Sequence, residues 1–127
     1  SINPKIEVIG VQSKAAPAAY LSWKSGDLQS NPNKTIAEGL GTALGFSYTI
    51  EIMRDLMDDF ILVSDEELES AVLLLLEHTH NLTEHAGAAS LAGALKIKDR
   101  LVDKRVVLIM SGGNLSMQHL RNIINKK

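Results

Sequence analysis

The chain has 127 residues, of which 45% are hydrophobic and 22% are charged, and this is the size and composition of one globular domain. Its 13 Lys and Arg residues are balanced by 15 Asp and Glu residues, which excludes a strongly basic nucleic-acid-binding surface. The absence of cysteine excludes disulfides and thiolate chemistry. A membrane-spanning helix needs about 20 consecutive apolar residues, and no stretch of the sequence is that long. We therefore expect one soluble, cytoplasmic domain that binds neither nucleic acid nor membrane.

The first third of the chain predicts a strand, a helix and a polar loop. Residues 6–11 form a short β-branched run that is typical of a buried strand. Residues 15–24 are rich in helix formers and are followed by Gly26, which predicts a helix that ends there. Residues 25–34 have the composition of a surface loop. Three glycines within residues 39–45 then suggest backbone placed for close approach to another group.

The middle of the chain predicts a helix, a strand and a second helix. Residues 46–57 have apolar side chains at helical spacing, and residues 60–63 are an apolar run bounded by polar residues. Ser64 and Glu67 have the spacing of a capping box, in which the serine hydroxyl and the glutamate carboxylate each bind a backbone amide of the first turn. This box predicts a helix over residues 65–79.

The last third predicts an alanine-rich helix over residues 86–98, a strand over 105–110 and a helix from about Ser116. The strand over 105–110 is the clearest of the chain, because it is apolar on both faces, as in a strand covered by helices on both sides. Strands and helices alternate. The expected class is therefore α/β, with a mainly parallel sheet and helices on both faces, in a single domain over residues 1–127.

Ligands in such folds bind at the carboxyl ends of the strands. The turn that leaves the predicted strand is Ser111-Gly112-Gly113-Asn114, which offers a hydroxyl, an amide and unobstructed backbone. The local pattern fits a ligand contact and an ordinary glycine turn equally well. The chain lacks the dinucleotide fingerprint, the P-loop and the serine-hydrolase elbow, which argues against those classes.

Histidines and one glutamate suggest two further sites. Glu84 and His85 precede the alanine-rich helix, and the simpler interpretation of Glu84 is a carboxylate matched to the helix dipole. His78, His80, Glu84 and His85 together suggest a zinc site and hence a small metal-dependent hydrolase. Solvated histidines at the end of a helix explain the cluster more simply, so that we predict no metal.

Four short segments, taken in order, resemble the threonine dehydratase and serine racemase family, which are pyridoxal-phosphate enzymes of fold type II. The segments are residues 35–39 (TIAEG), 63–67 (VSDEE), 84–89 (EHAGAA) and 111–114 (SGGN). The ordered set is far more specific than any one member. The resemblance implies pyridoxal 5'-phosphate as the cofactor, threonine or serine as the substrate, and a 2-oxo acid and ammonia as the products. It also implies a homo-oligomer.

The resemblance also implies roles for individual residues. Ser111 would face the pyridine nitrogen of the cofactor with its hydroxyl, Gly112 would lie beside it, and Asn114 would sit behind the serine. The backbone of Gly39 would lie near the cofactor ring, and Glu84 would border the substrate pocket. A hydroxyl partner suits a neutral ring nitrogen, which makes the cofactor a weaker electron sink.

The sequence departs from the family at several positions. His85 stands where a proline is common, and Gln12 and Ala18 stand where some members carry acidic cation ligands, so that this cation is not expected. His80 stands at the position of a nucleotide-responsive lysine of the racemases, which makes a serine racemase-like enzyme the less favoured alternative.

The largest departure is the lack of a lysine motif to bind the cofactor covalently and of a glycine-rich phosphate loop. The family carries both upstream of the matched region. The chain is therefore expected to be the C-terminal part of such an enzyme, inactive alone, with the missing N-terminal portion as its partner and no regulatory domain after Asn114. A non-catalytic binding or assembly module derived from this fold is the alternative from another class.

Overall fold

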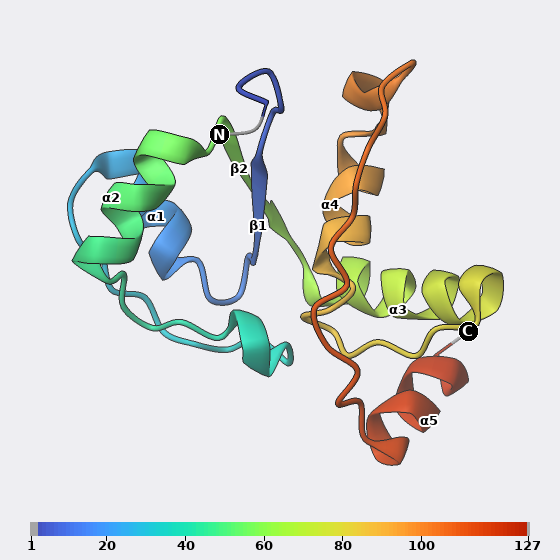
Figure 1. Ribbon diagram of the computed structural model, residues 1–127. Coiled ribbons are helices and arrows are strands. Elements are labelled where there is room, and N and C mark those ends of the chain that lie inside the picture. Colours follow the sequence, from blue (N-terminus) through green and yellow to red (C-terminus); the bar gives the residue numbers. More distant parts are fainter. Residues whose placement is uncertain (1–2, 127) are drawn as a thin grey trace.

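Two parallel strands lie at the centre of the structure, a computed structural model that describes residues 3–126 (Figure 1). They are β1 (Ile9–Ser13) and β2 (Asp59–Val63), and they pair with Ile9 opposite Asp59 and Ser13 opposite Val63. The predicted first strand began earlier, at residue 6. Parallel pairing places the carboxyl ends of both strands at the same edge of the sheet.

Five α-helices accompany the sheet in the described residues. They are α1 (Ala18–Ser25), α2 (Ser47–Leu56), α3 (Asp65–Thr79), α4 (Ala89–Lys96) and α5 (Met117–Asn125), with short 3₁₀ helices η1 (Glu38–Leu40) and η2 (Lys98–Leu101). The class is therefore α/β, with a two-stranded parallel sheet and five helices. Within residues 3–126, no helix is both long and apolar enough to cross a membrane.

Side chains alternate between the two faces of the strands, and each face meets different helices. Phe60 of β2 packs edge-on against Tyr20 and Trp23 of α1, with ring centroids 5.8 and 5.9 Å apart. On the other face, Val63 is fully buried in a core cluster with residues of α3 and α4, and Val11 packs against that cluster. Figure 1 shows α1 and α2 on one side of the strands and α4 on the other.

The prediction of a helix over residues 65–79 is confirmed at both ends by α3. The Glu67 amide donates to Ser64 Oγ at 3.2 Å, and the Ser64 amide donates to Glu67 Oε2 at 2.6 Å, which completes the capping box. At the other end, His80 adopts a left-handed conformation (φ 58°) and its amide donates to Leu76. These local signals lie within a few residues of one another, which is why the sequence alone could locate them.

The prediction of a strand over residues 105–110 is wrong for this chain. The segment lies without regular secondary structure beside α4, where Ser90 Oγ donates to the Ile109 carbonyl at 2.9 Å. The side chains from Val106 to Met110 are between 38% and 84% exposed. A strand exists only through hydrogen bonds to a neighbouring strand. In the described part of the chain, neither β1 nor β2 pairs with this segment.

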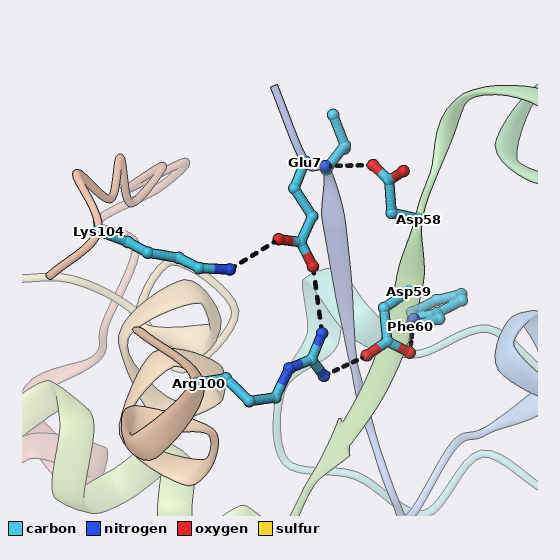
Figure 2. Close-up of polar contacts among 7 residues, drawn as sticks. Glu7, Asp58, Asp59, Phe60, Arg100 and Lys104 are labelled. Atoms are coloured by element: carbon cyan, nitrogen blue, oxygen red, sulfur yellow. Dashed lines mark hydrogen bonds and ion pairs between the residues drawn. The ribbon is translucent and has the colours of Figure 1, made fainter. Parts of the chain in front are cut away.

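Ion pairs at the amino end of the sheet tie the C-terminal half of the chain to the strands (Figure 2). Arg100 of η2 contacts Asp59 at 2.6 Å and Glu7 at 3.2 Å, and Lys104 contacts the same Glu7 at 3.2 Å. The Arg100 hydrogen bond holds the pKa of the Asp59 carboxyl below its usual value. The Val8 amide also donates to Asp58 Oδ2 at 2.7 Å, which extends the contact between the two strands beyond their first residues.

Candidate functional site

Glu84 joins the loop before α4 to the turn over residues 112–114 by two hydrogen bonds. Its backbone amide donates to the Gly112 carbonyl at 3.1 Å, and its carboxylate Oε2 accepts from the Asn114 amide at 3.1 Å. A Cβ atom on Gly112 would lie 2.5 Å from Glu84 Oε1, so that a side chain there would displace the Glu84 carboxylate. The two segments, far apart in sequence, therefore form one unit at the site.

Gly39 brings a third segment to the same place. A Cβ atom on Gly39 would lie 2.8 Å from Ala86 Cβ and 3.7 Å from Glu84 Oε1, so that η1 packs with its backbone directly on the loop over residues 84–86. Gly87 makes a similar approach to Gly112, because a Cβ atom on Gly87 would lie 3.1 Å from the Gly112 amide nitrogen. Gly39 therefore packs on the Ala86 side chain, and Gly87 packs on the backbone of Gly112, close to Glu84 in each case.

The predicted site residues meet at a cavity of about 380 Å³. Gly39, Glu84 and Asn114 line it, and Gly112 contacts Glu84 at its edge. Ser111 is exposed and does not line this cavity. Among residues 3–126, its hydroxyl makes no hydrogen bond, so that it is available to a ligand. The structure therefore brings together four of the five residues that the sequence singled out.

The simple interpretation of Glu84 as a helix-dipole residue is wrong. α4 begins at Ala89, and its first turn contains no acidic residue. Residues 85–88 form turns between Glu84 and the helix, which moves the carboxylate away from the helix amides. The Glu84 carboxylate instead accepts from the Asn114 amide.

The four members of the suggested zinc cluster do not form a metal site in the described structure. Within residues 3–126, no group of three or more His, Cys, Asp or Glu residues could hold a metal ion. His78 and His80 are exposed at the end of α3, as the interpretation of solvated histidines predicts. That interpretation is wrong for His85, which is only 4% exposed.

Burial affects both the hydrogen bonding and the pKa of the His85 imidazole. Its Nε2 atom has no hydrogen-bond partner in the described residues, and burial lowers the pKa of the imidazole, with a further lowering from His119. The centroids of the two imidazole rings lie 5.7 Å apart, in an edge-on arrangement. Because burial disfavours the charged imidazole, His85 packs as an aromatic ring against His119 of α5.

His119 is a site residue that sequence reasoning missed. It lines the cavity with Glu84 and also a neighbouring cavity of about 430 Å³ that is bounded by α3 and α5. The Ser116 Oγ atom accepts a hydrogen bond from the His119 backbone amide at 3.1 Å. Ser116 thereby caps the amino end of α5. His119 lies four residues before the buried Ile123, and this spacing places both on one face of the helix. The four-residue spacing between His119 and the apolar Ile123 was the feature of the sequence that could have identified His119 as a site residue.

Comparisons with known proteins identify the family to which the chain is similar. Residues 1–112 match the family described as "Pyridoxal-phosphate dependent enzyme". The catabolic L-threonine dehydratase TdcB of Escherichia coli is 35% identical over 126 residues, which are 97% of this chain and 38% of the relative. The chain therefore spans about two fifths of the length of the curated relative that it matches.

Solved structures give the same result in three dimensions. The processed form of a threonine deaminase isoform from Solanum lycopersicum matches with a TM-score of 0.88 and 27% identity, over 98% of this chain and 37% of that one. A serine racemase from Dictyostelium discoideum matches with a TM-score of 0.81 and 36% identity, over 92% of this chain and 38% of that one. Both likenesses cover nearly all of this chain and a minority of the other.

Proposed function

Because this chain belongs to the family of pyridoxal-phosphate dependent enzymes, we propose that it is the C-terminal part of a threonine or serine dehydratase of that family. The complete enzyme would convert the amino acid to a 2-oxo acid and ammonia. One observation carries the proposal: Gly39, Glu84 and the turn over residues 112–114 converge at one cavity, although they lie far apart in sequence.

The residues at this cavity fit one side of the cofactor. The Gly39 backbone, which lines the cavity, would lie near the cofactor ring, and the Ser111 hydroxyl would donate to a neutral ring nitrogen, with Gly112 beside it. Asn114 holds the turn in place through its amide, and Glu84 borders the space for the substrate. When bound, pyridoxal 5'-phosphate supplies the electron sink that stabilises negative charge on the substrate α-carbon.

A second polypeptide portion would complete the enzyme. The chain has no motif for the cofactor-binding lysine or for the phosphate loop, and within residues 105–110 the five consecutive apolar residues from Val106 to Met110 are all exposed. We propose that this segment is an inner strand of the large-domain sheet, covered by helices on both sides, when the N-terminal portion is present. The assembled enzyme would be a homo-oligomer, and the chain alone would not turn over.

The test is intact mass spectrometry of the protein purified under native conditions from its own cells, paired with an absorbance scan for bound cofactor. We expect a larger chain, or a second polypeptide that co-purifies, together with cofactor absorbance and 2-oxo acid formation from threonine or serine. A single species of 13.8 kDa without cofactor absorbance or 2-oxo acid formation would instead identify a non-catalytic module.

Serine racemase activity is the second candidate, because the Dictyostelium racemase is 36% identical over 92% of this chain. The two activities differ in their products. Chiral chromatography after incubation with L-serine separates them: D-serine as the main product would favour the racemase, and pyruvate would favour the dehydratase. His80, at the position of the racemase lysine, favours the dehydratase.

A further inference from the structure

One carboxylate, Asp65, joins three segments at the edge of the sheet where the candidate site lies. Its Oδ1 accepts from Thr35 Oγ1 at 2.7 Å and from Ser13 Oγ at 3.3 Å. Its Oδ2 accepts from the Ile36 amide at 3.1 Å. Both oxygens of the carboxylate are therefore engaged by the described residues, and none of these donors belongs to α3, the helix that carries Asp65.

The position of Asp65 follows from the topology of the sheet. Ser13 is the last residue of β1, and Asp65 begins α3 two residues after the end of β2. Because the strands are parallel, these two residues reach the same edge. The Lys14 amide donates to the Val63 carbonyl at 2.7 Å and holds the two strand ends together beside them.

From Asp65 the contacts lead directly to Gly39. The Thr35 hydroxyl accepts from the Ala37 amide at 3.1 Å, and Ala37 is 1% exposed in the core cluster. The next residues form η1, in which Gly39 packs on Ala86. With Asp65 at one end and Ala37 buried at the other, the segment over residues 35–37 has little freedom to move.

Resting on the function proposed above, we propose that Asp65 is the positioning residue that sets the path of residues 35–39 and therefore the place of the Gly39 backbone against the cofactor. It acts through the Thr35 hydroxyl and the Ile36 amide, and it does not touch the cofactor. Its place at the amino end of α3 also sets a carboxylate where the helix dipole favours negative charge.

Amide hydrogen exchange of the purified full chain, with any polypeptide that co-purifies, tests the proposal in an Asp65→Asn variant. The amide group of asparagine cannot accept from both donors on opposite oxygens. We expect the Ile36 and Ala37 amides to exchange about tenfold faster or more, as the loss of a hydrogen bond to a charged group implies. Amides in the middle of α3 should keep their exchange rates.

A Glu66→Gln variant is the matched control. It removes one carboxylate from the same first turn of α3, where the exposed Glu66 interacts with Ser64, whereas the Thr35 hydroxyl and the Ile36 amide donate to Asp65. The control should leave the exchange of Ile36 and Ala37 unchanged. Equal acceleration in both variants would assign the effect to charge at the helix end and would overturn the proposal.

Substitutions of Thr35 keep the proposal testable if Asp65→Asn does not fold. Thr35→Val removes the hydroxyl, whereas Thr35→Ser retains it. We expect faster exchange of Ala37 and a displaced Gly39 amide resonance in the valine variant, and rescue of both in the serine variant. Equal behaviour of the two variants would contradict a role for the hydroxyl.

Cofactor titration of the complete enzyme separates this proposal from the proposed function. We expect Asp65→Asn and Thr35→Val to weaken binding of pyridoxal 5'-phosphate, and Glu66→Gln and Thr35→Ser to leave it close to wild type. If the wild-type enzyme binds no cofactor, the proposed function fails, while the exchange rates still decide whether Asp65 positions residues 35–39.

Discussion

At the scale of single residues, Glu84 stabilises the site by accepting a hydrogen bond from the backbone of the facing turn. We expect Glu84→Ala to lower the free energy of unfolding by about 0.5–1.5 kcal/mol, because the hydrogen bond from the exposed Asn114 amide is lost and water replaces it. Glu84→Gln keeps one oxygen that can accept, so it should lose less than half as much. Urea denaturation of both variants measures the difference, and equal losses would argue against this hydrogen bond.

His85 makes stability depend on pH. Its pKa in the folded chain lies below the ordinary value near 6.5, because burial disfavours the charged form. The unfolded chain therefore binds more protons, and stability falls as the pH drops below about 6.5 towards the folded pKa. Asp65 and Glu69 oppose this shift, whereas His119 and Lys126 add to it.

Denaturant unfolding at about pH 7.5 and at about pH 5.5 measures this dependence. We expect the wild-type chain to lose stability between the two, and a His85→Phe variant, which keeps an aromatic ring, to lose clearly less. His78→Asn is the control, since His78 is exposed and its replacement should leave the slope unchanged. A slope as steep in His85→Phe as in wild type would assign the dependence to other groups.

At the scale of elements, the ion pairs of η2 connect the C-terminal half of the chain to the amino end of the sheet. We expect Arg100→Ala to cause a small loss of stability, because its partners are partly exposed and such pairs are weak. The loss should become smaller in about 1 M salt, where the screening length falls to about 3 Å.

The effect should also depend on pH. Arg100 holds the pKa of Asp59 below its ordinary value of 3.8, so this contribution is present above about pH 3.8 and is lost as the pH falls through the lowered pKa. Lys98→Ala, in the same 3₁₀ helix, is the control and should change little. A loss that persists in salt and at low pH would indicate packing by the arginine stem instead.

Elements that are fixed by neighbours in sequence could be predicted, and those fixed by distant partners could not. The capping box of Ser64 and Glu67 needs only four consecutive residues, and α3 has the predicted bounds. Residues 105–110 needed a neighbouring strand, which the described chain does not provide. Burial of His85 depended on α5, and the role of Asp65 depended on the pairing of two strands.

The candidate site could be predicted only in part, because several of its contacts join segments that are distant in sequence. Resemblance located Gly39, Glu84, Gly112 and Asn114, and the structure brings them to one place. It did not indicate that Glu84 accepts from the Asn114 amide, because that contact depends on how two distant loops meet. Polar residues close both strands, with Ser13 at the end of β1 and Asp65 two residues after β2, and this pattern is a signal for the contact between them.

At the scale of the whole molecule, the segment over residues 105–110 exposes consecutive apolar residues from Val106 to Met110, and such surfaces favour association between chains. We expect the isolated chain to self-associate and Val107→Lys to reduce this association, because Val107 is 84% exposed. The free energy of unfolding should change by no more than about 0.5 kcal/mol, as is usual for exposed positions. Sedimentation velocity and urea denaturation measure the two effects.

The control is Tyr48→Lys, on α2, where the side chain is 74% exposed. If the segment over residues 105–110 drives association, the tyrosine variant should associate as the wild type does. Equal reduction by both variants would show that added charge, and not the segment, decides the outcome.

The close approach of Gly87 to Gly112 limits the substitutions that position 87 can accept during evolution. A side chain at position 87 would meet the backbone of Gly112, which cannot turn aside as a flexible side chain can, so a replacement of Gly87 requires that segment to shift. A saturation mutagenesis screen should therefore find position 87 almost closed to substitution. In a homologous protein with another residue at this position, the turn over residues 112–114 must be displaced. A ligand bound by that turn would be displaced with it.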